Sequence, residues 1–329
     1  MTPLISRRQA IVTAATSASV CMASRSAFAQ SSAGDDGSSG PSNHQVSLTE
    51  PQTSTWELGL RMEPPVTCVN VFATFPFPAA WPEQDVKVIN KTIEGPIKAW
   101  GVNDLPGGTK QVWLQVPQLL KRANMELRLE VELTRRRIMP PTSTDGLLPP
   151  KKVPRELKLY TGNSPYIDAT HRLIRNASKL VAAQGASPGW AQVEAIYDYV
   201  RENVRYTEGD LKNASDALKD GTGDCEEMTS LFVAMCRNAK IPARMVWVEG
   251  HCYPEFYLVD EDEYGYWYPC QAAGSRLFGE MQEYRPIYQK GDRFKPQERK
   301  KPVRYISEFF RCDRRGKGTP NPEFFRKQV

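Results

Sequence analysis

The chain has 329 residues, of which 40% are hydrophobic, and it carries a formal net charge of +5. This hydrophobic share is enough for packed cores, and the length predicts two domains. The net charge is modest for a chain of this length. No stretch beyond the first 30 residues is apolar for long enough to span a membrane.

Residues 1–29 have the layout of a twin-arginine secretory signal. Arg7 and Arg8 precede a modest apolar run of small residues at 11–23, and Ala27-Phe28-Ala29 offers a cleavage site. We therefore expect an exported protein, periplasmic or extracellular, whose mature chain starts near Gln30. Residues 30–45 are rich in Ser, Gly, Asp and Pro and predict a flexible linker, so His44 is not taken as a site residue.

Residues 46–138 predict a small β-sandwich domain. Polar and apolar side chains alternate in short segments separated by Pro and Gly turns, which is typical of half-buried strands. We find no catalytic group of residues in this domain and expect it to cover or position the next one. The alternating segments are residues 56–61, 67–75, 111–116 and 125–133.

A proline-rich linker at 139–154 separates this domain from a second one at 155–290. The second domain opens with helical periodicity over 167–184, and Ser187-Pro188 then has the pattern of a second helix start. His171 lies in the first of these helices and is interpreted as a surface or capping residue.

Cys225 is expected in the first turn of a half-buried helix. Asp224 can cap that helix and Glu227, three residues on, can reach back to form a capping box. Unpaired backbone N–H groups and the helix dipole favour the thiolate at such a position. The alternative interpretation is a small buried core cysteine.

Three predicted strands follow this helix, at 241–248, 251–258 and 266–271. If they are antiparallel neighbours, they bring His251 and Gln271 side by side with the helix start packed over them. The order is then nucleophile, base and orienting group.

The blocks that carry these residues are GDCEEMTSLFVAMCRNAKIPARMVWVEGH and HCYPEFYL. They resemble the bacterial branch of the transglutaminase-like superfamily, and the resemblance extends over about residues 155–285. It implies an α+β fold with a papain-like transglutaminase core and a Cys-His-Asp triad, which in many relatives follows a β domain. No cofactor is predicted.

Gln271 stands where the resemblance implies the aspartate of the triad. A glutamine carbonyl can fix the tautomer of His251, but it offers no negative charge to an imidazolium, so His251 should be a weaker base. Three alternatives remain open: Gln271 itself serves as the orienting group, as an asparagine does in papain-like sites; Glu255 or Asp260 takes over as the carboxylate; or the site has lost catalysis and only binds.

Six cysteines remain once the signal, with Cys21, is removed. Cys252 and Cys270 flank the predicted site and could form a disulfide, or a zinc site with His251. The spacing is not that of a CxxC knuckle, so no metal is predicted. Proteins exported in the folded state can keep reduced cysteines, so the disulfide remains open.

Residues 291–329 form a basic C-terminal extension with interleaved aromatics. We interpret it as a solvated face that contacts anionic envelope polymers rather than nucleic acid.

These features predict an exported cysteine enzyme that acts on amide bonds of proteins or peptides through a thioester. The backbone N–H of Cys225 would supply part of an oxyanion hole. The resemblance favours hydrolysis over crosslinking. The alternative is a catalytically inactive binding or scaffold protein of the cell envelope, which the missing aspartate motivates.

Overall fold

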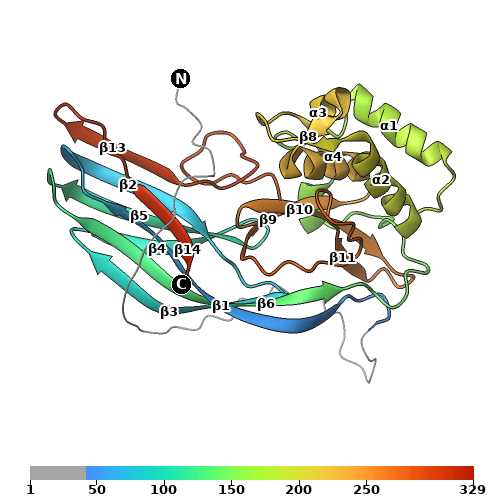
Figure 1. The fold of residues 1–329 in the computed structure, drawn as a ribbon, viewed down its shortest axis with the longest axis horizontal. Helices are drawn as coiled ribbons and strands as arrows, with labels where there is room; N and C mark the ends of the chain where they lie inside the picture. The colour runs from blue at the N-terminus through green and yellow to red at the C-terminus, as the bar shows by residue number, and fades with distance from the viewer. Residues whose placement is uncertain (1–41) are drawn as a thin grey trace. The chain divides into compact units, whose positions relative to one another are not determined.

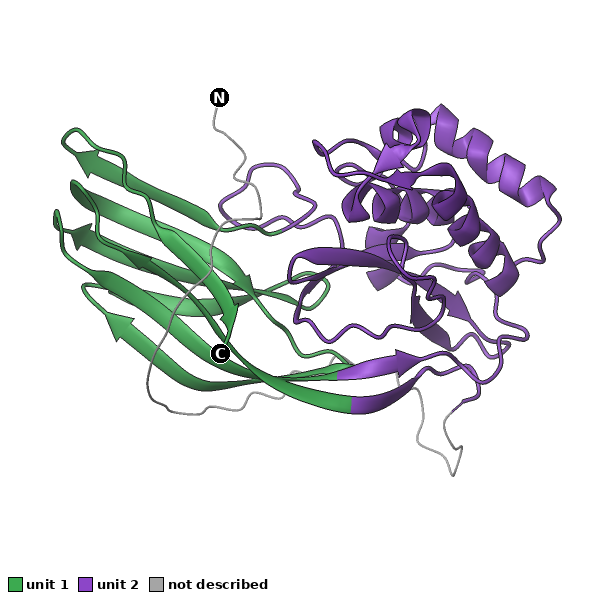
Figure 2. Cartoon of the chain, viewed as in Figure 1, with its two compact units in different colours: residues 1–30, 51–135, 306–329 green, residues 31–50, 136–305 purple. Residues whose placement is uncertain are grey.

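The computed structural model describes residues 42–329. The predicted signal and most of the predicted linker lie outside the described residues. The described chain divides into two compact units (Figure 2). Unit 1 comprises residues 51–135 and 306–329, and unit 2 comprises residues 42–50 and 136–305.

Unit 1 is built from two four-stranded sheets, with strand orders β14-β1-β6-β3 and β13-β2-β5-β4 (Figure 1). The segments predicted as strands lie within β1, β2, β5 and β6. The bounds are β1 Ser47–Met62, β2 Thr67–Phe77, β3 Gln84–Glu94, β4 Ala99–Leu105, β5 Thr109–Leu119, β6 Met125–Met139, β13 Phe309–Arg315 and β14 Glu323–Gln328.

The core of unit 1 is formed by alternate apolar side chains from both sheets, which are buried as the sequence alternation requires. Phe75 of β2 and Phe324 of β14 meet edge to face, with their ring centroids 6.3 Å apart. This aromatic pair joins one sheet to the other. Gly59 is required in β1, because a Cβ there would collide with the Leu127 carbonyl oxygen and the Phe325 ring.

Residues 306–329 belong to unit 1, although their composition predicts part of a basic C-terminal extension at 291–329. β13 pairs with β2 and β14 pairs with β1, both antiparallel. The pairing joins residues as distant in the chain as Phe309 and Thr74. A local sequence pattern carries no information on such long-range partners. Exposed Arg311, Arg314 and Arg315 also give the β13 sequence the composition of a charged tail.

Unit 2 contains the antiparallel sheet β11-β10-β9-β12, with helices α1–α4 gathered on one side of it (Figure 1). α4 is central and packs against α1, α2, α3, β9 and β10. The bounds are η1 Glu156–Tyr160, α1 Arg172–Ala183, α2 Trp190–Asn203, β7 Arg205–Tyr206, α3 Ala214–Asp220, β8 Thr222–Gly223, α4 Cys225–Asn238, β9 Ala243–Val248, β10 His251–Val259, β11 Gly265–Pro269 and β12 Ile287–Lys290.

Both predicted helix starts before α4 are shifted. α1 begins at Arg172 rather than at 167, because Ile167 bridges to Ser164, and His171 caps the helix by accepting from the Leu173 N–H at 3.4 Å. α2 begins at Trp190, after Gly189 at φ +90°. A Cβ on Gly189 would collide with the Leu147 carbonyl oxygen, so a glycine is needed at this turn.

No helix among residues 42–329 has both the length and the apolar character to cross a membrane.

Candidate active site

The start of α4 has the capping box that the sequence predicted. The Asp224 carboxylate accepts from the Glu226 N–H at 2.6 Å, and the Asp224 N–H donates to the Glu227 carboxylate at 2.9 Å. Gly223 leaves space for the Glu227 side chain to reach back to the Asp224 N–H, since a Cβ on residue 223 would lie 2.6 Å from the Glu227 Cβ. The first turn of α4 is therefore held in place from both sides.

Cys225 is the first residue of α4 and only 8% exposed. Its backbone N–H has no partner within the helix, as for every residue of a first turn. A hydrogen bond with Cys252 lowers the pKa of Cys225 most, burial raises it, and the hydrogen bond and charge of His251 lower it further, to a net value of about 5. The charge of Asp224 raises it in opposition. At neutral pH the sulfur is a thiolate.

His251 is the first residue of β10, and its Nε2 lies 2.9 Å from Oε1 of Gln271. Nε2–H donates to this amide oxygen, which leaves Nδ1 for the Cys225 side chain. Burial lowers the pKa of His251, but the hydrogen bond and charge of Cys225 and the bond with Gln271 raise it above its usual value. The structure thus brings all three predicted site residues together, with the ring set for an imidazolium beside a thiolate.

Gln271 lies two residues beyond the end of β11 rather than on that strand. Its backbone oxygen accepts from the Tyr197 hydroxyl at 2.9 Å and from Arg201 Nη1 at 3.0 Å. Its backbone N–H donates to the Leu277 oxygen at 2.8 Å. Burial raises the pKa of Tyr197 to about 12, so this hydroxyl keeps its proton and can donate.

Sequence reasoning missed Tyr197 and Arg201 as supports of the site. They are four residues apart on α2 and share one helix face, and that spacing was the available signal.

The two carboxylates considered as substitutes for the missing aspartate bond elsewhere. Glu255 is buried and pairs with Arg244 at 2.7 Å and with Lys290. Asp260 accepts from the Tyr266 hydroxyl and the Tyr264 N–H, each at 2.9 Å. Gln271 is the side chain that contacts the ring.

Glu283 and Arg285 form a charged pair near the site that the sequence did not predict. Arg285 donates through its side chain and backbone to Glu283, and Nη1 donates to the Glu249 oxygen at 3.1 Å, two residues before His251. Burial raises the pKa of Glu283, but the bonds and charge of Arg285 and the charge of His251 lower it below its usual value. This pair lies before β12, in a segment with no recognisable pattern.

None of the six cysteines of the described chain forms a disulfide, so Cys252 and Cys270 are not joined. Burial raises the pKa of Cys236 and of Cys270 well above the usual range. Cys252 instead donates its S–H to the Cys225 backbone oxygen at 3.4 Å. Within residues 42–329, no three His, Cys, Asp or Glu side chains are grouped so that they could hold a metal ion.

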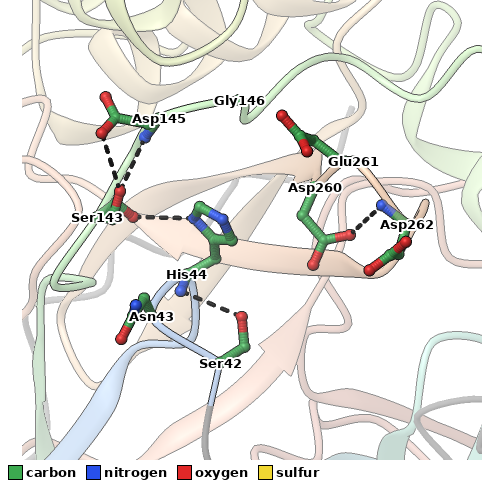
Figure 3. Close-up of a pocket in the computed structure, with 9 residues that line it drawn as sticks. All are labelled: Ser42, Asn43, His44, Ser143, Asp145, Gly146, Asp260, Glu261 and Asp262. Atoms are coloured by element: carbon green, nitrogen blue, oxygen red, sulfur yellow. Dashed lines mark hydrogen bonds between the residues drawn. The ribbon is translucent and has the colours of Figure 1, made fainter.

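A separate pocket of about 360 Å³ lies in unit 2, next to the end of β10 opposite His251 (Figure 3). His44 contributes to it, held by a bond between Nδ1 and the Ser143 oxygen at 3.1 Å. The Asp260 carboxylate on its wall already accepts from the Tyr264 and Asp262 N–H groups. None of Cys225, His251 and Gln271 lines this pocket.

A family model described as the transglutaminase-like superfamily matches residues 177–272, a segment that contains Cys225, His251 and Gln271. Comparison with curated proteins gives no match. Among solved structures, a proposed cysteine protease from Cytophaga hutchinsonii is similar, with 14% sequence identity and a TM-score of 0.56. The match covers 86% of this chain and 93% of that chain.

A proposed protease from Parabacteroides distasonis matches at 11% identity over 67% of this chain and 47% of that chain. Its TM-score of 0.27 is too low to carry weight. The family match supports a transglutaminase-like domain over residues 177–272, and the first structure supports a mixed α/β fold for the chain.

Proposed function

We propose that this protein is an exported cysteine enzyme that hydrolyses amide bonds of proteins or peptides through a thioester. The observation that carries the proposal is a thiol at a helix start, with a pKa of about 5, beside an imidazole oriented by Gln271. Such a pair is the nucleophile and acid–base unit that acyl transfer requires.

In the first step, the Cys225 sulfur attacks the carbonyl carbon and an S–C bond forms. The electron pair moves to the carbonyl oxygen, which the Cys225 N–H stabilises. The His251 imidazolium then gives its proton to the leaving nitrogen as the C–N bond breaks. This step leaves a thioester and neutral His251.

In the second step, His251 takes a proton from water, which attacks the thioester and releases the acid and the thiolate. With an amine in place of water, the same site would crosslink. The fold likeness to a proposed cysteine protease favours hydrolysis, so water is the acceptor in this proposal.

A test compares hydrolysis of casein and incorporation of a labelled amine by the wild type and Cys225→Ala. We expect peptide release that Cys225→Ala abolishes, because Cys225 is the thiol at the start of α4 whose pKa is lowered by its contact with His251. Cys236→Ala, a buried thiol on the same helix, is the matched control and should retain activity. Amine incorporation in place of peptide release would make the protein a transglutaminase.

The second candidate function is a non-catalytic peptide-binding or scaffold protein of the cell envelope. It is favoured by one observation, the neutral Gln271 as the partner of His251. Retained peptide binding without turnover, in the wild type and in Gln271→Asp, would support the scaffold over the enzyme.

Export through the twin-arginine route is part of the proposal and is supported by Arg7, Arg8 and the Ala27-Phe28-Ala29 pattern. A mature N-terminus near Gln30 in the periplasmic or secreted fraction is expected, and Arg7→Lys with Arg8→Lys should abolish it. The exposed Arg293, Lys295, Arg299, Lys300 and Lys301 suit contact with anionic envelope polymers.

A further inference from the structure

A second thiol, Cys252, lies directly against the proposed nucleophile. It is completely buried on β10, next to His251 in sequence, and its S–H donates to the Cys225 backbone oxygen at 3.4 Å. A hydrogen bond from Cys252 to the Cys225 side chain is also the largest cause of the lowered pKa of Cys225. A single S–H therefore has two acceptors on the same residue.

The surroundings of the two sulfurs decide which one ionises. Cys225 lies at the N-terminus of α4 and beside the imidazole of His251, and both favour the ionised sulfur. Cys252 is part of the apolar core with Phe256 and Leu258, where a charge would be poorly solvated. Cys252 therefore remains a thiol, and its proton is available to a neighbouring anion.

We propose that Cys252 is a positioning residue whose S–H turns from the Cys225 carbonyl oxygen to the Cys225 sulfur when that sulfur ionises, and so stabilises the thiolate. The assignment deepens the proposed function, on which its role in catalysis rests. A hydrogen bond to an anion is stronger than one to a neutral carbonyl, which gives the turn its driving force.

The charges around Cys225 explain why such a donor matters here. The Asp224 carboxylate opposes ionisation from the capping position, while His251 and Arg285 favour it. Glu283 neutralises Arg285, and Gln271 adds no charge behind His251. With no carboxylate behind the imidazole, a donor placed on the sulfur itself supplies stabilisation that does not depend on the charge of His251.

The test measures the rate of Cys225 alkylation by iodoacetamide against pH on the full chain, with the labelled residue assigned by peptide mass spectrometry. All samples are fully reduced first, since two sulfurs joined as a disulfide would not react. Wild type, Cys252→Ala, Cys252→Val and Cys252→Ser are compared. Cys236→Ala is the control for removal of a buried thiol from the same core.

We expect a wild-type midpoint near pH 5 and a midpoint at least one pH unit higher in Cys252→Ala and Cys252→Val. At pH 5 this is a loss of at least about fivefold in alkylation rate, because the thiolate fraction falls from about one half to about one tenth. Cys252→Ser, which keeps a donor, should retain most of the wild-type behaviour, and Cys236→Ala should match wild type. Valine preserves core volume, so the midpoint of Cys252→Val decides between the two outcomes if Cys252→Ala does not fold.

An unchanged midpoint in Cys252→Ala or in folded Cys252→Val would overturn the assignment, as would a serine variant no better than valine. Alkylation needs no substrate, so a failure of the Cys252 proposal can be distinguished from a failure of the proposed function. If the alkylation midpoint rises in Cys252→Ala and Cys252→Val but no protein hydrolyses casein, the proposed function is refuted and the role of Cys252 as a donor stands. If casein is hydrolysed but the alkylation midpoint does not move in these variants, the proposed function stands and the role of Cys252 as a donor is refuted.

Discussion

Gln271 orients the ring of His251 without adding charge to the site. The amide oxygen accepts from Nε2 at 2.9 Å, and the backbone of Gln271 is fixed by Tyr197 and Arg201. The amide can thus preserve geometry, but it gives less support to an imidazolium than a carboxylate would.

We predict different effects for two substitutions of Gln271. Gln271→Ala should slow casein hydrolysis by about 10²-fold, because the ring loses its orienting partner. Gln271→Asp should retain hydrolysis and move the basic limb of its pH profile upward, because a carboxylate raises the pKa of His251 further. The measurement is hydrolysis rate against pH for the three proteins.

The acid limb in these profiles should lie near pH 5, the pKa of Cys225, and the basic limb above the ordinary histidine value. The lowered thiol pKa means that the thiolate is lost as pH falls through 5. The raised imidazole pKa means that the proton is lost only as pH rises past it. A basic limb that stays in place in Gln271→Asp would contradict the role given to residue 271.

The predictability of the site differs from residue to residue. Cys225, His251 and Gln271 sit in three compact blocks with capping or strand patterns, so their order alone suggested that they meet. Glu283 and Arg285 come from a segment between β11 and β12 without periodicity. Their position follows from tertiary folding, which no local pattern encodes.

Helix α4 sets the chemistry through its first turn. Asp224 caps the helix through its carboxylate oxygen, and the same charge raises the pKa of Cys225. Capping stabilises the helix, whereas the charge opposes the thiolate, so the two roles of Asp224 can be separated by substitution.

We predict that Asp224→Asn keeps the cap, since asparagine caps as well as aspartate, and moves the midpoint of Cys225 alkylation to lower pH. Asp224→Ala should lose about 1 kcal/mol of stability in urea unfolding. An alkylation midpoint in Asp224→Asn equal to or above that of wild type would contradict the electrostatic part of this account.

The far end of α4 is fixed by a completely buried ion pair. Arg237 Nη2 lies 2.7 Å from the Asp292 carboxylate, and Arg237 also donates to the oxygens of Ala243 and Gly162. Asp292 follows β12, so this pair ties the helix to the segment after the sheet. Removing one charge would leave the other buried without compensation.

At the scale of the whole molecule, the two units should respond separately to core substitutions. Asp292→Asn should cost about 3–5 kcal/mol, because Arg237 is left unpaired in unit 2. Phe324→Ala should cost about 2 kcal/mol, less than for a fully buried phenylalanine, because it removes a half-buried side chain and its contact with Phe75 in unit 1. Hydrogen exchange read by mass spectrometry should show faster exchange mainly in the unit that carries the change.

Equal acceleration in both units for either variant would show that they unfold as one. The neighbouring Phe325→Leu, which keeps an apolar side chain on the same strand, is the control for Phe324→Ala.

The strands β1, β2, β5 and β6 could be predicted because each alternates over a long stretch. β13 and β14 could not, because their short patterns gain meaning only from partners at the other end of the chain, such as Trp56 opposite Gln328.

This pairing has a consequence for biosynthesis. The ribosome must complete the entire sequence of unit 2 before β13 and β14 emerge to join β2 and β1. Until then the long strands β1 and β2 lie at sheet edges without their final partners, and these edges are open to association with other chains. A ribosome stalled anywhere before residue 306 would therefore release an aggregation-prone fragment, even one that already contains a complete unit 2.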